Sequence, residues 1–203
     1  MSEQQTAARR KPFARSLLSG VALTAILATA WVVKETAPGE EQWQAGMPVA
    51  GAIGDTLTGR NIEATVHEVR IAESVTASTG WAGPTTGIWV VAEISVAAVV
   101  DDIGIGLGTA ELAIGDVVYS ASDRPADGTI IGESMTTGLA LTGPIMFEIS
   151  TELLDTADAT HATLRFAQSS DSRLDSLIVV PVDLRALDIA KSIETDEPVW
   201  GNE

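Results

Sequence analysis

The sequence predicts an all-β domain, an immunoglobulin-like antiparallel β-sandwich, behind a single N-terminal transmembrane helix. From residue 51 onward, short apolar runs rich in Val, Ile and Thr recur, and residues typical of turns (Gly, Asp, Ser and Pro) separate them. About seven to nine such runs fit two packed sheets, and a barrel is the alternative closure. The helix is predicted by one long uncharged run near the N-terminus.

The uncharged run extends from Ser16 to Val33 and is long enough to span a bilayer. As a helix it would cover ~27 Å at ~1.5 Å per residue, close to the ~30 Å of hydrocarbon in a typical membrane. Basic residues precede the run, whereas Glu35, Glu40 and Glu41 follow it. The positive-inside rule therefore predicts a cytoplasmic N-terminus and an extracellular C-terminal domain at the cell membrane. The basic residues are Arg9, Arg10, Lys11 and Arg15.

A cleaved signal peptide is the alternative interpretation of the same run. Ala28-Thr29-Ala30 has the small residues of a signal peptidase site, and cleavage there would release a soluble secreted protein beginning at Trp31. Trp31-Val32-Val33 prolong the apolar run past that site, which favours retention of the helix as a membrane anchor. Under both interpretations the rest of the chain is exported.

Composition divides the chain into five expected segments. A stalk is expected where Pro38-Gly39 and Pro48 interrupt any periodicity, and an acidic, mobile tail is expected at the C-terminus. The segments are a basic cytoplasmic tail (1–15), the transmembrane helix or signal peptide (16–33), the stalk (34–50), the sandwich ectodomain (51–185) and the acidic tail (186–203).

The strongest strand signal lies in the first half of the sandwich. Gly87–Val100 alternates over its whole length and is expected to be the central strand. Asn61–Val75 also alternates, but its apolar positions change phase near His67, which predicts a β-bulge. Ala77–Thr86, with its glycines and proline, is expected to be a loop between these strands.

The second half of the sandwich contains shorter signals. Pro181 lacks a backbone N–H, so its strand is expected at a sheet edge or bulged there. A single helical turn is expected over Glu152-Leu153-Leu154, capped by Ser150 or Thr151. The expected strands are a hairpin within Glu111–Ser122 turning at Gly115-Asp116, then Pro144–Ile149, Ala162–Ala167 and Ser176–Leu184, with weaker edge-like runs at Thr129–Ile131 and Thr137–Leu141.

The charge of the exported part restricts its partners. From Glu35 onward, seven basic residues stand against 27 acidic ones, which gives a formal charge of −20. Such a surface repels nucleic acid phosphates and anionic lipid headgroups, so neither is an expected partner. The chain contains no cysteine, which excludes disulfides, thiolate metal sites and cysteine nucleophiles.

Motifs for catalysis or metal binding are not recognised in the sequence. His67 and His161 lie outside any catalytic motif, and no Gly-x-Ser-x-Gly run occurs. Paired aspartates in loops offer oxygen ligands, but none has a known calcium-loop spacing, so solvated acids are the expectation. We therefore expect a protein without cofactor or metal that is not an enzyme; a wall-polymer hydrolase acting through loop carboxylates is the remaining alternative. The pairs are Asp101-Asp102, Asp123 with Asp127, and Asp171 with Asp175.

Trp81 is the candidate contact for a partner. It lies between Gly80 and Gly83 in the expected loop, where an exposed indole would bind another molecule, or alternatively would fold back over the end of the sandwich. Asp101 and Asp102 are the other candidate partner-binding residues. The expected partner is an envelope protein or a wall component.

Four stretches carry a resemblance to a known family: Gly54–Leu57, Gly87–Ile94, Leu112–Tyr119 and Thr142–Ile149. In their order the chain resembles a bacterial extracytoplasmic domain family of unknown function, found after a lipoprotein signal or a single membrane helix. That family is similar to a small secreted mycobacterial antigen with an immunoglobulin-like sandwich. The resemblance covers about residues 51–184, brings no catalytic residues, and implies an envelope-tethered binding or sensing role.

Overall fold

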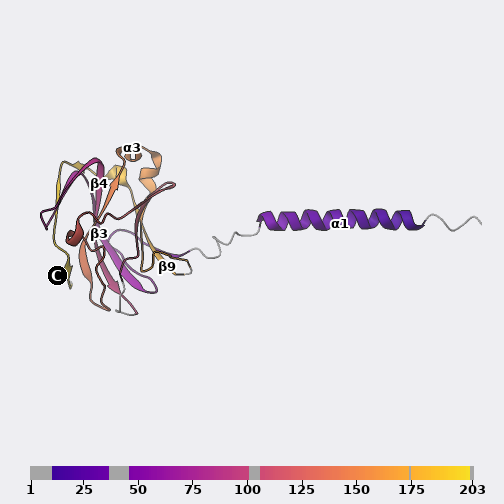
Figure 1. Ribbon diagram of the computed structural model, residues 1–203, viewed down its shortest axis with the longest axis horizontal. Helices are drawn as coiled ribbons and strands as arrows, with labels where there is room; N and C mark the ends of the chain where they lie inside the picture. The colour runs from indigo at the N-terminus through magenta and orange to yellow at the C-terminus, as the bar shows by residue number, and fades with distance from the viewer. Residues whose placement is uncertain (1–10, 37–45, 101–105, 174, 202–203) are drawn as a thin grey trace, which may run out of the picture. The chain divides into compact units, whose positions relative to one another are not determined.

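The computed structural model describes residues 11–36, 46–100, 106–173 and 175–201, with side chains from residue 19 onward. The chain forms two compact units, Met1–Gln44 and Ala45–Glu203. The first contains the helix α1, Lys11–Thr36 (Figure 1). It continues beyond Val33 into residues expected to be stalk, and the Thr36 hydroxyl donates to the Val32 carbonyl at 2.8 Å. In the described part of the chain, no helix combines enough length with enough apolar character to cross a membrane.

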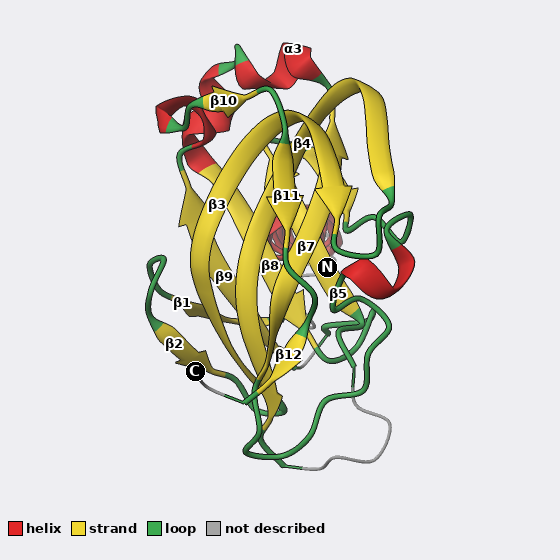
Figure 2. Ribbon diagram, turned by 90° about the vertical axis from the view of Figure 1, so that its left-hand side faces the viewer, coloured by secondary structure: helices red, strands yellow, loops and turns green. Residues whose placement is uncertain are grey.

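The second unit is a β-sandwich, which confirms the predicted fold type. One sheet has five strands in the order β1-β9-β8-β5-β6, and the other has β10-β3-β4-β7-β12, with β2 and β11 also paired to β3 (Figure 2). The strands are β1 Met47–Ala50, β2 Thr56–Thr58, β3 Ile62–Ala77, β4 Ala82–Ala98, β5 Thr109–Ile114, β6 Val117–Ser120, β7 Leu141–Ile149, β8 Ala162–Ala167, β9 Ser176–Val182, β10 Ile189–Ala190, β11 Ile193–Thr195 and β12 Val199–Trp200.

The sandwich is not wholly antiparallel. β1 runs parallel to β9, and β10 and β11 run parallel to β3. Each of these parallel strands is short, and many residues separate it in sequence from the strand with which it pairs. Such a long connection is what parallel pairing requires. The remaining pairings are antiparallel, as predicted.

The core lies between the two sheets and follows from strand alternation. Every second residue of β4, from Ile88 to Ala98, points into it, and β4 lies between β3 and β7, which confirms it as the central strand. The other sheet contributes residues such as Leu112, Leu164 and Phe166, which are fully buried. A domain without disulfides depends on such a continuous apolar core.

β3 contains two bulges. The first register shift, between Val66 and Glu68, confirms the bulge predicted near His67. The second, between Ala72 and Ser74, was not predicted. The first inserts one unpaired residue, His67, and so reverses which face the following side chains occupy. At the second, one residue of β3 lies against four residues of β4, because Ala72 pairs with Trp89 and Ser74 with Pro84.

The expected loop Ala77–Thr86 is wrong for most of its length, because β4 begins at Ala82. Gly83, which was expected in the loop, and Gly87, which was expected at the start of the central strand, both allow close packing. A Cβ on Gly83 would collide with the Trp81 indole, and one on Gly87 would collide with the Ile149 carbonyl. The β3–β4 connection is therefore a short turn ending at Trp81.

The expected mobile tail from 186 to 203 is also corrected. β11 pairs with β3, and β12 pairs with β7 (Figure 2). Ile193 is buried, so this segment belongs to the fold despite its acids. At the other end of the sandwich sequence, β1 occupies residues expected to be stalk.

Smaller elements give mixed outcomes. Residues 129–131 and 137–140 form turns and isolated bridges, not strands, although Thr129 is buried and donates to the Pro144 carbonyl at 2.8 Å. The helical turn α3, Thr151–Leu154, is confirmed, but Ser150 makes no side-chain capping bond.

Pro181 lies in β9, which is an inner strand and not the expected sheet edge. The neighbouring strand β1 ends opposite Val179, so the position where Pro181 lacks an N–H faces no paired strand. Short 3-10 turns complete the fold: η1 Ala126–Gly128, η2 Ala157–His161 and η3 Leu184–Ala186.

Candidate functional site

Trp81 packs back onto the sandwich. Its ring lies edge-to-face against Trp89 of β4, with 5.7 Å between centroids and planes at 87°. The indole is partly buried, which matches the second of the two alternatives expected for it. The Trp89 indole N–H donates to the Gly83 carbonyl at 2.8 Å, so both tryptophans are held by the start of β4.

Arg124 covers both indoles. Its guanidinium carbon lies 5.5 Å from the Trp81 ring centroid and 5.4 Å from that of Trp89, within the range of cation–π attraction. It also pairs with Glu148 of β7 at 2.6 Å, and the Thr85 hydroxyl donates to the second oxygen of the same carboxylate. We call Trp81, Thr85, Trp89, Arg124 and Glu148 the tryptophan cluster.

The underside of the tryptophan cluster is apolar. Trp89 packs there with residues on the outer face of the larger sheet and with Ile193 of β11. The Arg124 side chain remains 43% exposed, so the cluster presents a cation and part of an indole to solvent. The apolar residues beneath are Ala72, Val75, Val91 and Met146.

Asp101 and Asp102 lie outside the described residues. Val100, which precedes them, follows the C-terminal end of β4, whereas Trp81 precedes its N-terminal end. The structure therefore places Trp81 and the neighbour of Asp101 at opposite ends of one strand. The sequence analysis had named both Trp81 and Asp101 as candidate partner contacts.

His67, Ser95 and Thr142 form a hydrogen-bonded row across β3, β4 and β7. His67 Nε2 lies 2.6 Å from Ser95 Oγ, which lies 2.6 Å from Thr142 Oγ1. A serine hydroxyl beside an imidazole has the distance of a nucleophile and its base. Within the described residues, however, no carboxylate hydrogen-bonds to His67, so the row lacks the third group of a triad. Its observed effect is to tie three neighbouring strands together.

Glu93 lies one row further along the same face. Burial raises its pKa above the ordinary value of 4.5, Arg70 opposes that shift, and Asp196 and Glu68 add to it. Arg70 itself lies 3.3 Å from Glu68. Asp196 belongs to the C-terminal segment that the sequence analysis treated as a tail, so this electrostatic coupling was not foreseen.

A groove of about 480 Å³ runs between β3 and the C-terminal segment. Its volume is within the range of small-molecule sites. Arg70 is the cation in its lining, and Asp188 and Glu194 are the acids; the remaining lining residues are Val69, Ile71, Leu187, Ala190, Ser192 and Ile193. Both acids come from one short segment, Asp188–Glu194, which the sequence analysis treated as a tail.

Two of the loop aspartates considered for calcium, Asp171 and Asp175, accept hydrogen bonds from protein donors. Arg173 binds both oxygens of Asp171, and this hydrogen bonding lowers the pKa of Asp171 to about 2. Asp175 accepts from the Asn61 side chain at 2.9 Å. In the described part of the chain, three or more potential metal ligands are nowhere gathered.

Comparisons with known proteins give structural matches alone. No family model matches the chain, and no curated protein matches it. An uncharacterised β-sandwich protein from Clostridium difficile 630 is 14% identical, with a TM-score of 0.45, covering 71% of this chain and 99% of that one. The YjhA protein from Bacillus subtilis is 16% identical, with a TM-score of 0.46, covering 64% of this chain and 98% of that one.

Proposed function

We propose that the protein is a single-pass membrane protein with a cytoplasmic N-terminus, whose immunoglobulin-like sandwich is a non-catalytic binding module in the cell envelope. The observation that carries the proposal is the uncharged run within α1, flanked by basic residues on its N-terminal side.

The distribution of apolar side chains on α1 supports an anchor. Successive residues of a helix turn by about 100°, so its large apolar residues point in every direction and not along one stripe. They are 51% to 68% exposed on the helix. The uncharged run begins at Ser16, whereas the described side chains begin at Ser19, so Leu17 and Leu18 add to its apolar length. The exposed residues are Val21, Leu23, Ile26, Leu27, Trp31, Val32 and Val33.

The tryptophan cluster supports the binding role. Tryptophan and arginine are the residue types that most often dominate binding energy at protein interfaces, and Trp81 and Arg124 lie together at the surface. We keep Trp81, Asp101 and Asp102 as the predicted partner contacts. The partner is an envelope protein or wall component, since the acidic surface disfavours nucleic acid and anionic lipid.

The absence of cysteine from the sequence gives a direct topology test. Single cysteines at Ser2 and Ser120 report the two sides of the membrane. A membrane-impermeant maleimide added to intact cells should label Ser120→Cys and leave Ser2→Cys unlabelled until the cells are lysed. Labelling of Ser2→Cys alone would overturn the orientation. Intact mass separates an anchor from a cleaved signal, because cleavage leaves an N-terminus at Trp31.

Site-specific photocrosslinking tests the binding role. A photoreactive residue at Trp81 should give a discrete adduct in intact cells, whereas the same residue at Trp200, which is 46% exposed, is the surface control. Adducts from neither Trp81 nor Asp101 nor Asp102 would contradict these positions as the binding surface.

A further inference from the structure

The outer face of the five-stranded sheet carries few charged residues. Leu112, Leu164 and Val180 point into the core, so the alternate residues of their strands point outward. The outward residues with exposed surface are mainly Leu177, Val179 and Pro181 of β9, Thr163 of β8 and Val118 of β6, whereas Ala113 of β5 is only 3% exposed. We call this surface the β9 face.

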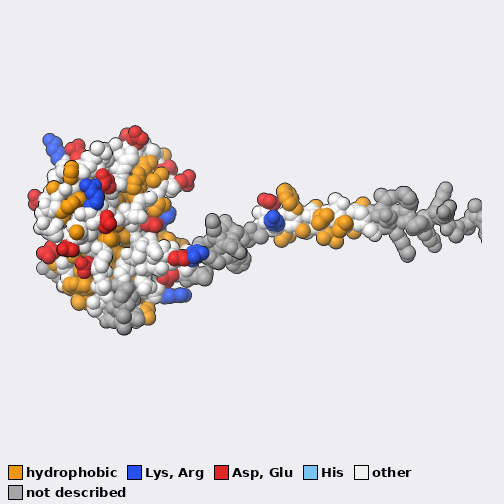
Figure 3. Space-filling view, in the orientation of Figure 1, with side chains coloured by type: hydrophobic (Ala, Val, Ile, Leu, Met, Phe, Trp, Pro, Cys, Tyr) orange, Lys and Arg blue, Asp and Glu red, His pale blue; other side chains and the backbone are white. Residues whose placement is uncertain are grey.

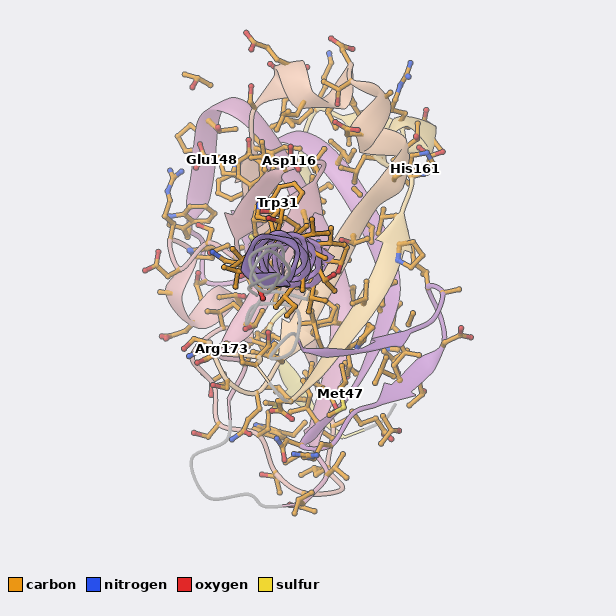
Figure 4. All side chains as sticks on the ribbon, turned by 90° about the vertical axis from the view of Figure 1, so that its right-hand side faces the viewer. Trp31, Met47, Asp116, Glu148, His161 and Arg173 are labelled. Atoms are coloured by element: carbon orange, nitrogen blue, oxygen red, sulfur yellow. The ribbon has the colours of Figure 1, made fainter. Side chains whose placement is uncertain are left out.

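The β9 face carries few charges on a strongly acidic domain. Among the outward residues of β5, β6, β8 and β9, only Arg165 and Glu111 are charged. The exported part as a whole has a formal charge of −20, and acidic side chains outnumber basic ones over the view in Figure 3. A centre depleted of charge with a polar rim is the composition of a protein interface. The β9 face is shown from its own side in Figure 4, where Asp116 and His161 lie toward one end and Arg173 toward the other.

Arg165 and Glu111 are neighbours that do not pair with each other. They are register partners on β8 and β5, and both are half-buried. Arg165 Nε donates to Thr163 Oγ1 at 3.3 Å, and no ion pair joins Arg165 to Glu111 among the described contacts. A half-buried cation and a half-buried anion therefore lie side by side, each able to accept a partner from outside.

We propose that the β9 face is the contact between two copies of this chain related by a two-fold axis. A two-fold contact requires a surface complementary to itself. One cation beside one anion meets that requirement, because the rotation places Arg165 of each copy opposite Glu111 of the other. A partner of unrelated sequence would not require a cation and an anion side by side on this face. A basic partner would bind best to a face rich in acidic residues, whereas the centre of the β9 face is neutral.

The size of the face makes the contact dependent on local concentration. Five strands spaced ~4.8 Å apart and about five residues long cover ~24 Å by ~18 Å, or ~900 Å² over two copies, which is below the ~1,200 Å² of stable interfaces. Confinement to a membrane raises the effective concentration of the two faces to the millimolar range. In this respect the inference rests on the proposed anchor.

Crosslinking in native membranes tests the contact. With the cysteine-free full-length chain, Thr163→Cys treated with a short bis-maleimide should give a covalent dimer. Thr65→Cys, on the outer face of the other sheet, is the matched control and should stay monomeric. A dimer from Thr65→Cys or from Ala25→Cys in α1, without one from Thr163→Cys, would overturn the assignment to this face.

Charge reversal tests the two-fold pairing itself. In the Thr163→Cys background, Arg165→Glu alone or Glu111→Arg alone should reduce the crosslinked dimer about tenfold, because each brings like charges together. Co-expression of the two single variants with different tags should restore mixed dimers, since their charges are then complementary between copies. Unchanged crosslinking in the single variants, or failure of mixed dimers to form while both variants remain folded by circular dichroism, would overturn the proposal.

Carbonate extraction separates this result from the anchor. A chain retained in the membrane that fails to crosslink contradicts the dimer, whereas a chain extracted as soluble contradicts the anchor. In the latter case the same variants are crosslinked as purified full-length protein at about 1 mM, the concentration that confinement would have supplied. Absence of the Thr163→Cys dimer there also contradicts the proposal.

Discussion

At the scale of single residues, Arg124 connects two tryptophans and a glutamate outside the core. It joins β4 and β7 by covering two indoles and pairing with Glu148. Its position in a turn, far in sequence from both tryptophans, gave no sign of this role. Strand patterns locate Trp89 and Glu148 on predicted strands, but pairing across the sheet depends on register, which alternation alone does not fix.

Replacing Arg124 should show how much these contacts contribute to the free energy of unfolding. We expect Arg124→Ala to lower the free energy of unfolding by about 1 kcal/mol, since a partly exposed cation–π contact and ion pair each contribute about that or less. Arg173→Ala is the control, because its ion pair with Asp171 is exposed, and should leave the free energy of unfolding nearly unchanged. Urea titrations followed by tryptophan fluorescence measure both. Equal effects in the two variants would contradict the role assigned to Arg124.

Glu93 should make stability depend on pH. Because burial raises its folded pKa, the folded chain holds the proton more tightly than the unfolded chain. The resulting stability is fully present below the unfolded pKa of about 4.5 and is lost as the pH rises through the raised folded pKa.

Glu93→Gln should therefore be more stable than the parent protein at pH 7, with the difference vanishing below pH 4.5. Glu73→Gln, at an exposed position of β3, is the control and should follow the parent at every pH. Thermal unfolding from pH 4 to 8 measures the effect. A gain that persists at low pH would show that charge at Glu93 is not the cause.

At the scale of elements, long alternating strands were predictable and short edge strands were not. β4 alternates over its full length, and the bulge at His67 left its mark as a change of phase in the sequence. β10, β11 and β12 have two or three residues each, too few for a period to be recognised, and their acids resemble a solvated tail. The prediction at Gly83 was wrong for a related reason: in a sequence, a glycine needed for close packing cannot be distinguished from one needed for a turn.

Two isoleucines test whether the C-terminal segment belongs to the fold. Ile193 is 5% exposed and Ile189 is 55% exposed. We expect Ile193→Ala to destabilise the domain by about 2–4 kcal/mol, as cavity-forming substitutions do, and Ile189→Ala by less than about 1 kcal/mol. Chemical denaturation of both variants measures the contrast. Similar small effects would restore the interpretation of this segment as a tail.

At the scale of the whole molecule, the fold type was predictable and the placement of the loops was not. Binary patterning is enough to specify two packed sheets, because burying one face of every strand leaves few alternatives. That Trp81 and Val100 lie at opposite ends of β4 could not be deduced from composition. Which loops meet at one end of a sandwich depends on strand connectivity, and that is a property of the complete sheet order.

The proposed anchor leads to a whole-molecule prediction. Ala25→Asp, near the centre of the uncharged run, should reduce the membrane-inserted fraction, since an acid there costs about 2.5–3.5 kcal/mol of insertion. Thr36→Asp, at the end of α1, is the control and should insert normally. Carbonate-resistant membrane association measures both. Equal insertion of the two variants would contradict an anchor centred on this run.

The parallel pairing of β1 with β9 has a consequence for how the molecule is made. The first strand of the sandwich finds its neighbour only after Ser176–Val182 is available, and β12 completes the opposite sheet later still. In the topology proposed above, the residues that follow α1 cross the membrane before β9 and β12 do. The sandwich would therefore remain incompletely folded during most of its translocation, because closure by such distant segments slows acquisition of the native topology.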